Sequence, residues 1–188
     1  MSARRSPLSA GRVVRASCLA GVTCVLLACG PATVDHTPTG NLLDTDTQSI
    51  EESVGHWQAW YSTDIRRSTD GAQRGQASLR IAITEPFGWG VAFDNWPGFP
   101  AAPGRHRAEL WARTAAGSAL DLSVTLHWRD ESGNDLDQTQ VRVPLERAWR
   151  KVGRDLTAPP GTTRVWLELT GSEGEPGDAI EVDEVFVL

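Results

Sequence analysis

The alternation of apolar and polar side chains after residue 40 constrains the fold of this chain more than any other sequence feature. Leucine or isoleucine occupies every second position of 79–83, and a longer run with the same period covers 120–128. Because successive side chains of a β-strand point to opposite faces, each run predicts a strand with one buried face. Similar runs of this period are found at 108–112, 141–145, 165–169 and 180–182.

The segments between these runs are rich in Gly, Pro, Asn and Asp, which favour turns. Segment 130–137 lies between two of the runs and predicts a hairpin turn. Its acidic side chains do not form an EF-hand, because the glycine is misplaced and no glutamate closes the loop. Many short strands without a long amphipathic helix predict an all-β fold, a β-sandwich of the jelly-roll type.

The first 28 residues have the composition of a secretory signal. Four arginines precede an uncharged apolar run over 18–28, which is shorter than the roughly 20 residues that span a bilayer. The Leu-Leu-Ala-Cys string at 26–29 resembles the lipobox of bacterial lipoproteins. This resemblance implies cleavage before Cys29 and lipidation of its thiol, and Gly30 resembles the pattern of outer-membrane sorting.

The predicted organisation is therefore a signal peptide over 1–28, a flexible spacer over 29–40 and one β-sandwich domain over 41–188. The spacer contains few residues that could form a core. We expect an exported protein that is anchored by lipid to the cell envelope, at the outer membrane, since two or more acyl chains hold a protein stably.

Cysteine count and charge limit the partners of the domain. Cys18 and Cys24 precede the predicted cleavage site and Cys29 would be lipidated, so no cysteine remains for a disulfide. Four of the 18 Lys and Arg residues lie in the signal, which leaves 14 against 24 Asp and Glu residues, a net charge of −10. Nucleic acid requires a basic face, so we exclude it as a partner.

The sequence carries no recognisable catalytic motif. The four histidines have no zinc-ligand spacing, and there is no Gly-x-Ser-x-Gly elbow for a nucleophile. Paired carboxylates that cleave glycosidic bonds stay an open alternative, because sequence alone does not show which carboxylates face each other. The expectation is a protein that is not an enzyme.

Eight tryptophans accompany a single tyrosine, which is an unusual ratio. An aromatic plane packs against the C–H face of a sugar ring, while amide, carboxylate and guanidinium groups bond its hydroxyls. Three of the tryptophans continue an apolar face or stand where a strand starts, so we assign Trp57, Trp128 and Trp149 to the core.

Two other tryptophans are predicted to point away from the core. Trp166 is out of phase with its apolar neighbours and shares its face with Arg164 and Glu168, which makes all three candidates for carbohydrate binding. Trp111 is out of phase in the same way. For both tryptophans the alternative is packing against a covering loop.

Trp89 and Trp96 complete the set of candidate sugar-binding residues. They flank a stretch with aspartate and asparagine in a Gly- and Pro-rich part of the sequence. This setting predicts aromatic side chains on a loop, where binding residues are often found.

A series of short motifs extends over residues 41–188. It comprises Asn41-Leu42-Leu43, Ser49-Ile50-Glu51, Trp57, Gly75-Gln76-Ala77-Ser78-Leu79, Trp128-Arg129-Asp130, Thr157-Ala158-Pro159 and Val182-Asp183-Glu184-Val185. In order and spacing the series resembles carbohydrate-binding modules of families 4, 9 and 22. The resemblance implies a galactose-binding-like jelly roll, a polysaccharide or oligosaccharide as partner, and a structural calcium.

The calcium ligands that the resemblance implies are Glu51 of the opening motif, Asp183 of the closing motif and Ser78. Oxygen ligands from distant segments suit calcium. Two functions follow as hypotheses: a tethered module that binds a glycan without catalysis, or a structural or protein-interaction sandwich of the envelope. They differ in whether the candidate tryptophans line an open groove.

Overall fold

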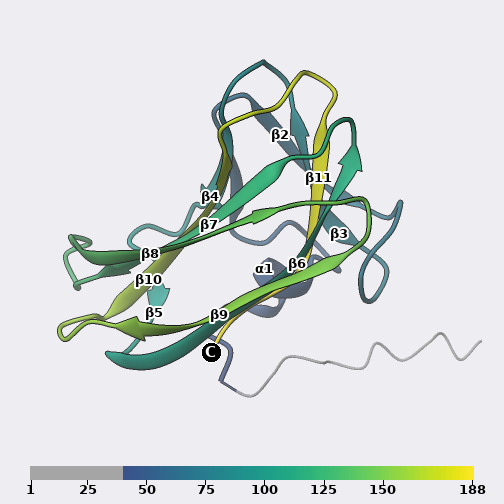
Figure 1. Ribbon diagram of the computed structural model, residues 1–188. Helices are drawn as coiled ribbons and strands as arrows, with labels where there is room; N and C mark the ends of the chain where they lie inside the picture. The colour runs from purple at the N-terminus through teal and green to yellow at the C-terminus, as the bar shows by residue number, and fades with distance from the viewer. Residues whose placement is uncertain (1–39) are drawn as a thin grey trace, which may run out of the picture. The chain divides into compact units, whose positions relative to one another are not determined.

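The computed structural model describes residues 40–188, which form a β-sandwich (Figure 1). The predicted signal peptide, the lipidation site Cys29 and residues 29–39 of the predicted spacer lie outside the described residues. Within residues 40–188, no helix is long and apolar enough to cross a membrane.

One short helix and eleven strands make up the domain. They are α1 (Thr45–Ser49), β1 (Trp57–Trp60), β2 (Thr63–Ser68), β3 (Ser78–Ile83), β4 (Trp89–Phe93), β5 (Phe99–Pro100), β6 (Gly104–Ala116), β7 (Asp121–Arg129), β8 (Asp135–Pro144), β9 (Arg150–Ala158), β10 (Arg164–Gly171) and β11 (Ala179–Val187). The all-β prediction is confirmed.

The strands form two antiparallel sheets. Sheet A has the order β1-β4-β10-β7-β8, with β5 paired to β10, and sheet B has the order β2-β3-β11-β6-β9. Between them lies an apolar core to which every predicted alternating run contributes, as Leu79, Leu110, Leu126, Leu167 and Ile180 illustrate. Each sheet therefore has one face in the core and one outer face.

The turn between β7 and β8 shows how local sequence sets strand pairing. The Asp130 side chain accepts hydrogen bonds from both the backbone and the side-chain amide of Asn134, each 2.9 Å long. Gly133 adopts a φ of 84°, in the left-handed region that glycine reaches without strain. The predicted hairpin is therefore confirmed, and it aligns β8 along the edge of sheet A.

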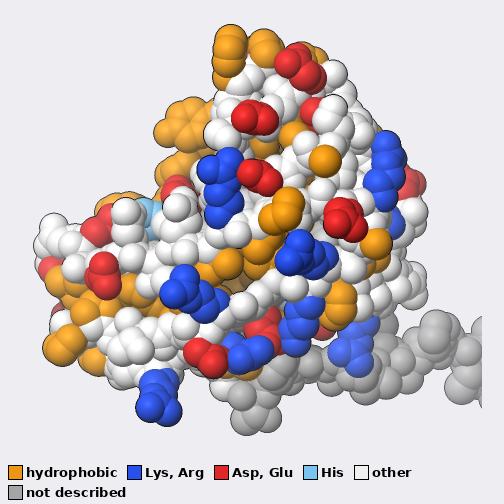
Figure 2. Space-filling model, viewed as in Figure 1, with side chains coloured by type: hydrophobic (Ala, Val, Ile, Leu, Met, Phe, Trp, Pro, Cys, Tyr) orange, Lys and Arg blue, Asp and Glu red, His pale blue; other side chains and the backbone are white. Residues whose placement is uncertain are grey.

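The two ends of the sandwich differ. At one end the chain enters beside its own C-terminus, where the Leu42 amide donates to the Val187 carbonyl at 2.8 Å. The other end, which we call the tip, consists of the loops 60–63, 84–88 and 171–178. The Gly177 amide donates there to the Ile83 carbonyl at 3.1 Å. The tip is at the top of Figure 1, and Figure 2 shows hydrophobic and acidic side chains protruding there.

Candidate functional site

The outer face of sheet A carries many side chains suited to hydrogen bonding, which Gly90 and Ala92 of β4 interrupt. Strand pairing places Glu168 between Ala92 and Thr125, and it places Trp166 beside His127. On the neighbouring strands the same face continues through Gln58, Trp60, Thr170, Ser123, Gln138, Gln140 and Arg142. We call this surface the polar face of sheet A.

Trp166 lies at the centre of an aromatic cluster on this face. It points away from the core, as its phase predicts, but it is only 4% exposed. Its indole N–H donates to the Phe93 carbonyl at 2.7 Å. The ring centroids of Trp60, His127 and Trp96 lie 5.1, 5.2 and 6.4 Å away. Neighbouring side chains thus cover Trp166, so the aromatic surfaces open to a ligand are those of its neighbours.

Arg129 fixes the position of Trp96. Its guanidinium carbon lies 4.0 Å from the Trp96 ring centroid and 4.6 Å from that of Trp166. Asp135 accepts a hydrogen bond of 2.5 Å from Arg129 Nε, which holds the guanidinium between the two rings. Trp96 is 64% exposed. Because one of its sides rests on a cation, the ring is held in place while much of its surface remains open.

His127 adds a cationic group to the middle of the face. Its Nδ1 lies 3.0 Å from Asp135 Oδ2 and its Nε2 lies 3.6 Å from Glu168 Oε1. The Glu168 carboxylate raises the pKa of His127, partial burial opposes this, and Asp135 adds to the increase. These contacts therefore favour the charged form of the ring more than in a free histidine, and His127 in turn holds the Glu168 carboxylate in place.

Trp89 does not belong to this site. The loop prediction for it was wrong, because Trp89 begins β4, a strand buried along its whole length. Its side chain is 1% exposed and packs so closely on Gly171 that a Cβ there would lie 2.2 Å from the indole nitrogen. Trp89 therefore stabilises the core and offers no surface to a ligand.

Trp111 also lies away from this site, although it points outward. It belongs to β6 of sheet B, where it pairs with Lys151 and Asp183, so it is on the opposite side of the sandwich from Trp166. Arg164 is on the same strand as Trp166 and pairs with Arg129, which places it at the border of the polar face. The structure thus brings together Trp166, Trp96, Arg164 and Glu168.

The core assignments of tryptophan are correct for two residues. Trp57 and Trp128 are 3% and 0% exposed. Trp149 is only half-buried, in the loop before β9, where the guanidinium carbon of Arg113 lies 4.8 Å from its ring centroid. Its prediction as a core residue was wrong, because it lies just before β9, out of phase with the buried Val152, and packs against the Arg113 guanidinium instead of entering the core.

Sequence reasoning missed Trp60, Arg129 and His127 as site residues. Gln58 and Trp60 are two positions apart in a strand, so both side chains fall on one face of sheet A. This spacing could have identified Trp60 as a site residue from the sequence. The role of Arg129 depends on its contacts with Trp96 and Trp166, which come from separate strands and loops and leave no local pattern.

The three residues implied as calcium ligands hold one loop, 71–76. Asp183 Oδ2 accepts backbone N–H bonds of 2.8 and 3.0 Å from this loop. Glu51 accepts another at 3.0 Å, and the Ser78 hydroxyl donates to a loop carbonyl at 3.2 Å. The loop therefore lies against sheet B, far from the polar face of sheet A.

The chemistry of these residues fits calcium in part. Asp183 is fully buried, and burial raises its pKa to about 7; backbone N–H bonds oppose the shift and the charge of Glu184 increases it. A cation would offset the excess negative charge. Within residues 40–188, however, no three His, Cys, Asp or Glu side chains converge to hold a metal. Glu51 and Asp183 supply suitable oxygens, and carbonyls or water would have to complete the roughly six to eight ligands.

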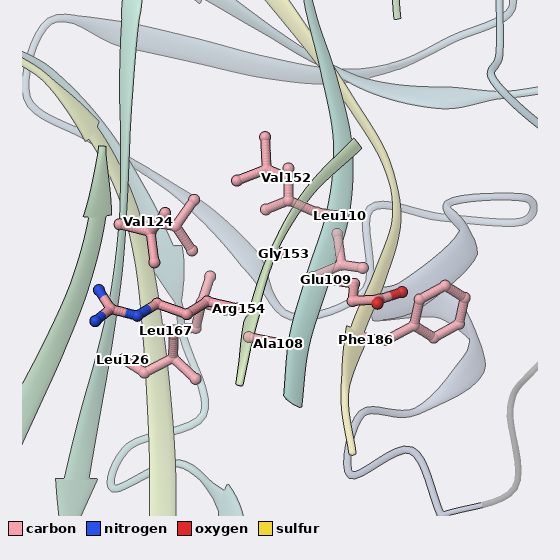
Figure 3. A pocket seen from close by; sticks show the side chains of 12 residues that line it. Ala108, Glu109, Leu110, Val124, Leu126, Val152, Gly153, Arg154, Leu167 and Phe186 are labelled. Carbon is pink, nitrogen blue, oxygen red and sulfur yellow. The ribbon is translucent and has the colours of Figure 1, made fainter. Parts of the chain in front are cut away.

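A narrow apolar opening between the two sheets is unrelated to the polar face (Figure 3). Its lining includes Leu110, Val124, Val152 and Leu167, with Arg154 beside them. Among the described residues that line this opening there is no tryptophan and there are few hydrogen-bonding groups. It is a gap in the hydrophobic core between β6 and β9 on one side and β7 and β10 on the other.

Comparisons with known proteins support the fold. No family model matches the sequence, and no curated protein matches it. Among solved structures, the CBM22-1 xylan-binding domain from Paenibacillus barcinonensis Xyn10C has a TM-score of 0.57 at 19% identity, over 78% of this chain and 92% of that domain. The structure of TmCBM61 in complex with β-1,4-galactotriose has a TM-score of 0.56 at 17% identity, over 79% of this chain and 97% of that one.

A third similar structure is larger. The enzymatically active domain of bacteriophage CBA120 tailspike protein 4 has a TM-score of 0.59 at 13% identity, and the match covers 78% of this chain but only 21% of that one. At such low identities the likeness establishes the fold alone. That fold is the jelly-roll sandwich found in carbohydrate-binding modules.

Proposed function

We propose that the polar face of sheet A binds a polysaccharide or oligosaccharide without cleaving it. The observation that carries this proposal is the pairing of an exposed ring, Trp96, and a half-buried ring, Trp60, with a row of amide, carboxylate and imidazolium side chains. The rings offer surfaces for the C–H face of a sugar. Gln58, Gln138 and Gln140 are exposed and offer donors and acceptors for its hydroxyls, and Glu168 offers an acceptor.

The similar structures add support of a weaker kind. A xylan-binding domain and a complex with β-1,4-galactotriose share this fold. Because one fold hosts many functions, the argument for this chain depends on the side chains of its own outer face. The tailspike match belongs to a domain described as enzymatically active, so the proposed lack of catalysis is tested separately.

The test is glycan-array binding followed by calorimetric titration of each glycan that binds. We expect Trp60→Ala and Trp96→Ala each to weaken binding about tenfold, the loss typical of an aromatic residue at the centre of an interface. The matched control is Trp111→Ala, which removes an outward tryptophan from sheet B and should leave affinity unchanged. Product analysis after prolonged incubation should find the glycan intact, and released sugar would overturn the non-catalytic assignment.

A structural or protein-interaction module of the cell envelope is the second candidate. The observation in its favour is that Trp166 is only 4% exposed, so the centre of the face is packed by aromatic side chains rather than hollowed into a groove. Absence of binding to every glycan on the array, with the protein folded, would favour this candidate over the first.

We propose further that Cys29 anchors the protein by lipid to the outer membrane after export. The support is the Leu-Leu-Ala-Cys string together with the basic and apolar segments before it. The test is partition of the protein into detergent and mass spectrometry of the N-terminal peptide. Cys29→Ser should abolish both the added lipid mass and the detergent partition.

A structural calcium at Glu51 and Asp183 stays a prediction of the family resemblance. A ligand that binds the folded state alone raises the melting temperature. We therefore expect calcium to raise the Tm of the protein and a chelator to reverse the increase, while Glu51→Gln should abolish the response. An unchanged Tm over a wide calcium range would contradict the prediction.

A further inference from the structure

Two aromatic side chains at the tip are more exposed than any other large hydrophobic residue in the described part of the chain. Tyr61 is 73% exposed and Phe87 is 80% exposed. They belong to neighbouring loops, which the Thr84 amide joins by donating to the Ser62 carbonyl at 2.8 Å. Exposed aromatic groups that are placed together indicate a surface for binding.

The backbone at both positions is in a conformation that glycine adopts far more readily. The φ angle is 37° at Tyr61 and 94° at Phe87. A non-glycine residue at positive φ carries strain, and such strain is concentrated at functional sites. Glycine would relieve the strain, so backbone geometry does not account for two aromatic residues here.

Tyr61 is continuous with the polar face of sheet A. Its ring lies over Gly90, where an added Cβ would be 3.4 Å from Tyr61 Cδ2. The ring centroid of Trp60 is 6.0 Å away, and Trp60 in turn is adjacent to Trp166, which leads to Trp96. The ring contacts form a row that crosses sheet A from Trp96 through Trp166 of β10 to Trp60 of β1 and continues beyond the end of the sheet to Tyr61 at the tip.

We infer that this aromatic row binds an extended, neutral sugar chain that passes over Trp96 and Trp60 and continues over the tip onto Tyr61 and Phe87. The inference depends on the proposed function and specifies its ligand as a long chain rather than a single sugar or a chain end. Glu85 is exposed on the loop that carries Phe87, and Asp64 is exposed at the start of β2, next to the loop that carries Tyr61. Their carboxylates accept hydroxyl groups but repel an acidic polymer, which favours a neutral glycan.

The experiment measures how affinity depends on chain length. The full-length protein is titrated with xylo-oligosaccharides and with β-1,4-galacto-oligosaccharides from the disaccharide to the hexasaccharide, and with the corresponding polymers. We expect the affinity of the parent protein to increase with length. The Tyr61→Ala, Phe87→Ala double variant should lose about tenfold for the longest chains and little for the disaccharide. Leu136→Ala, which truncates an exposed apolar residue outside the row, is the matched control.

A second measurement separates loss of binding from loss of folding. Tyr61→Gly and Phe87→Gly should unfold at the same or a higher temperature than the parent, because glycine relieves the strain, and both should still lose the length-dependent gain. If the tip variants bind long chains as tightly as the parent does, this inference is wrong while the proposed function stands. If Trp60→Ala and Trp96→Ala also have no effect, or if no glycan binds, the proposed function fails and the inference fails with it.

Discussion

The outer faces of the two sheets have similar residue types but use them differently. On sheet B the charged groups neutralise one another: Glu181 is 1% exposed and lies 3.3 Å from Arg80 and 2.6 Å from Arg113. Lys151 contacts Glu109 in the same way at 2.6 Å. Loop 71–76 covers part of this face, and all nine residues of β11 are buried.

Sheet A also pairs its central charges, because Asp135 contacts both Arg129 and His127, but it leaves its amide side chains open. Gln58, Gln138 and Gln140 are exposed, and the ring of Trp96 is held in place with much of its surface free. Charged groups that have partners on their own face contribute to stability, whereas groups that remain open can bond a ligand. The comparison indicates that an outward face is suited to binding when some of its polar groups have no hydrogen-bond or ion-pair partner within the protein.

The largest expected effect is a loss of stability from a substitution on sheet B, with no change in glycan binding by sheet A. Glu181→Ala leaves the guanidinium groups of Arg80 and Arg113 without their common partner, and we expect the free energy of unfolding to fall by about 3 kcal/mol in urea denaturation. Glu181→Gln is the control for side-chain size. Glycan affinity, measured where the variant is folded, should stay unchanged, and its loss would contradict the division of roles between the faces.

The next effect comes from a substitution on sheet A, which should lower both stability and glycan affinity. Trp166→Ala removes the ring that supports both Trp60 and Trp96, so we expect a fall in stability of about 3 kcal/mol together with weaker glycan binding. Trp166→Phe should retain more of both. Full affinity in a folded Trp166→Ala variant, measured by calorimetry, would show that the neighbouring rings do not need this support.

A smaller effect depends on pH. Glu168 and Asp135 raise the pKa of His127 in the folded state, so the imidazolium contributes stability that is present below the unfolded-state pKa of about 6.5 and is lost as the pH rises through the higher folded-state value. Arg129, also within this cluster, opposes the charge. Comparison of the parent and His127→Gln across neutral pH should show a difference below about 1 kcal/mol that decreases as the pH rises. A difference in stability that does not change with pH would show that protonation of His127 is not its cause.

The smallest effect concerns the rim of sheet B. Lys151 and Glu109 form an ion pair in which the lysine is 49% exposed. Because solvent screens such pairs, Lys151→Ala should change stability by about 0.5 kcal/mol and less at high salt. Denaturation at two salt concentrations tests this, and a larger loss would mean that this face is more tightly coupled than its exposure indicates.

The strands with regular alternation could be predicted from the sequence, and those without it could not. Runs 79–83 and 120–128 have one buried face each, which leaves a clear period of two. Strand β4 is buried on both faces, so its Trp-Gly-Val-Ala-Phe sequence has no alternation, and the surrounding glycines and prolines resemble a loop.

The candidate site was harder to predict than the strands. The position of a residue in the alternation of its strand indicates only that its side chain points outward. Trp111 and Trp166 have the same outward phase, and nothing near them in sequence tells which sheet each one joins. Nor does the sequence near Trp166 reveal that Trp60, from a distant strand, packs against it. A period of two shows which side chains of a strand point outward. Which residues from different strands meet on one surface depends on the order of the strands in the sheet.

The hydrogen bond between Leu42 and Val187 also matters for how the domain can be attached to other proteins. Since Leu42 and Val187 lie at the same end of the sandwich and the tip is the other end, a domain joined to residue 40 or to residue 188 is attached at the end away from the tip. In a domain that starts at residue 40, a short peptide could also join Gly40 to Leu188, so that the chain could be reopened in an exposed loop such as 146–148. The tip therefore stays exposed when the sandwich is attached to another protein at this end.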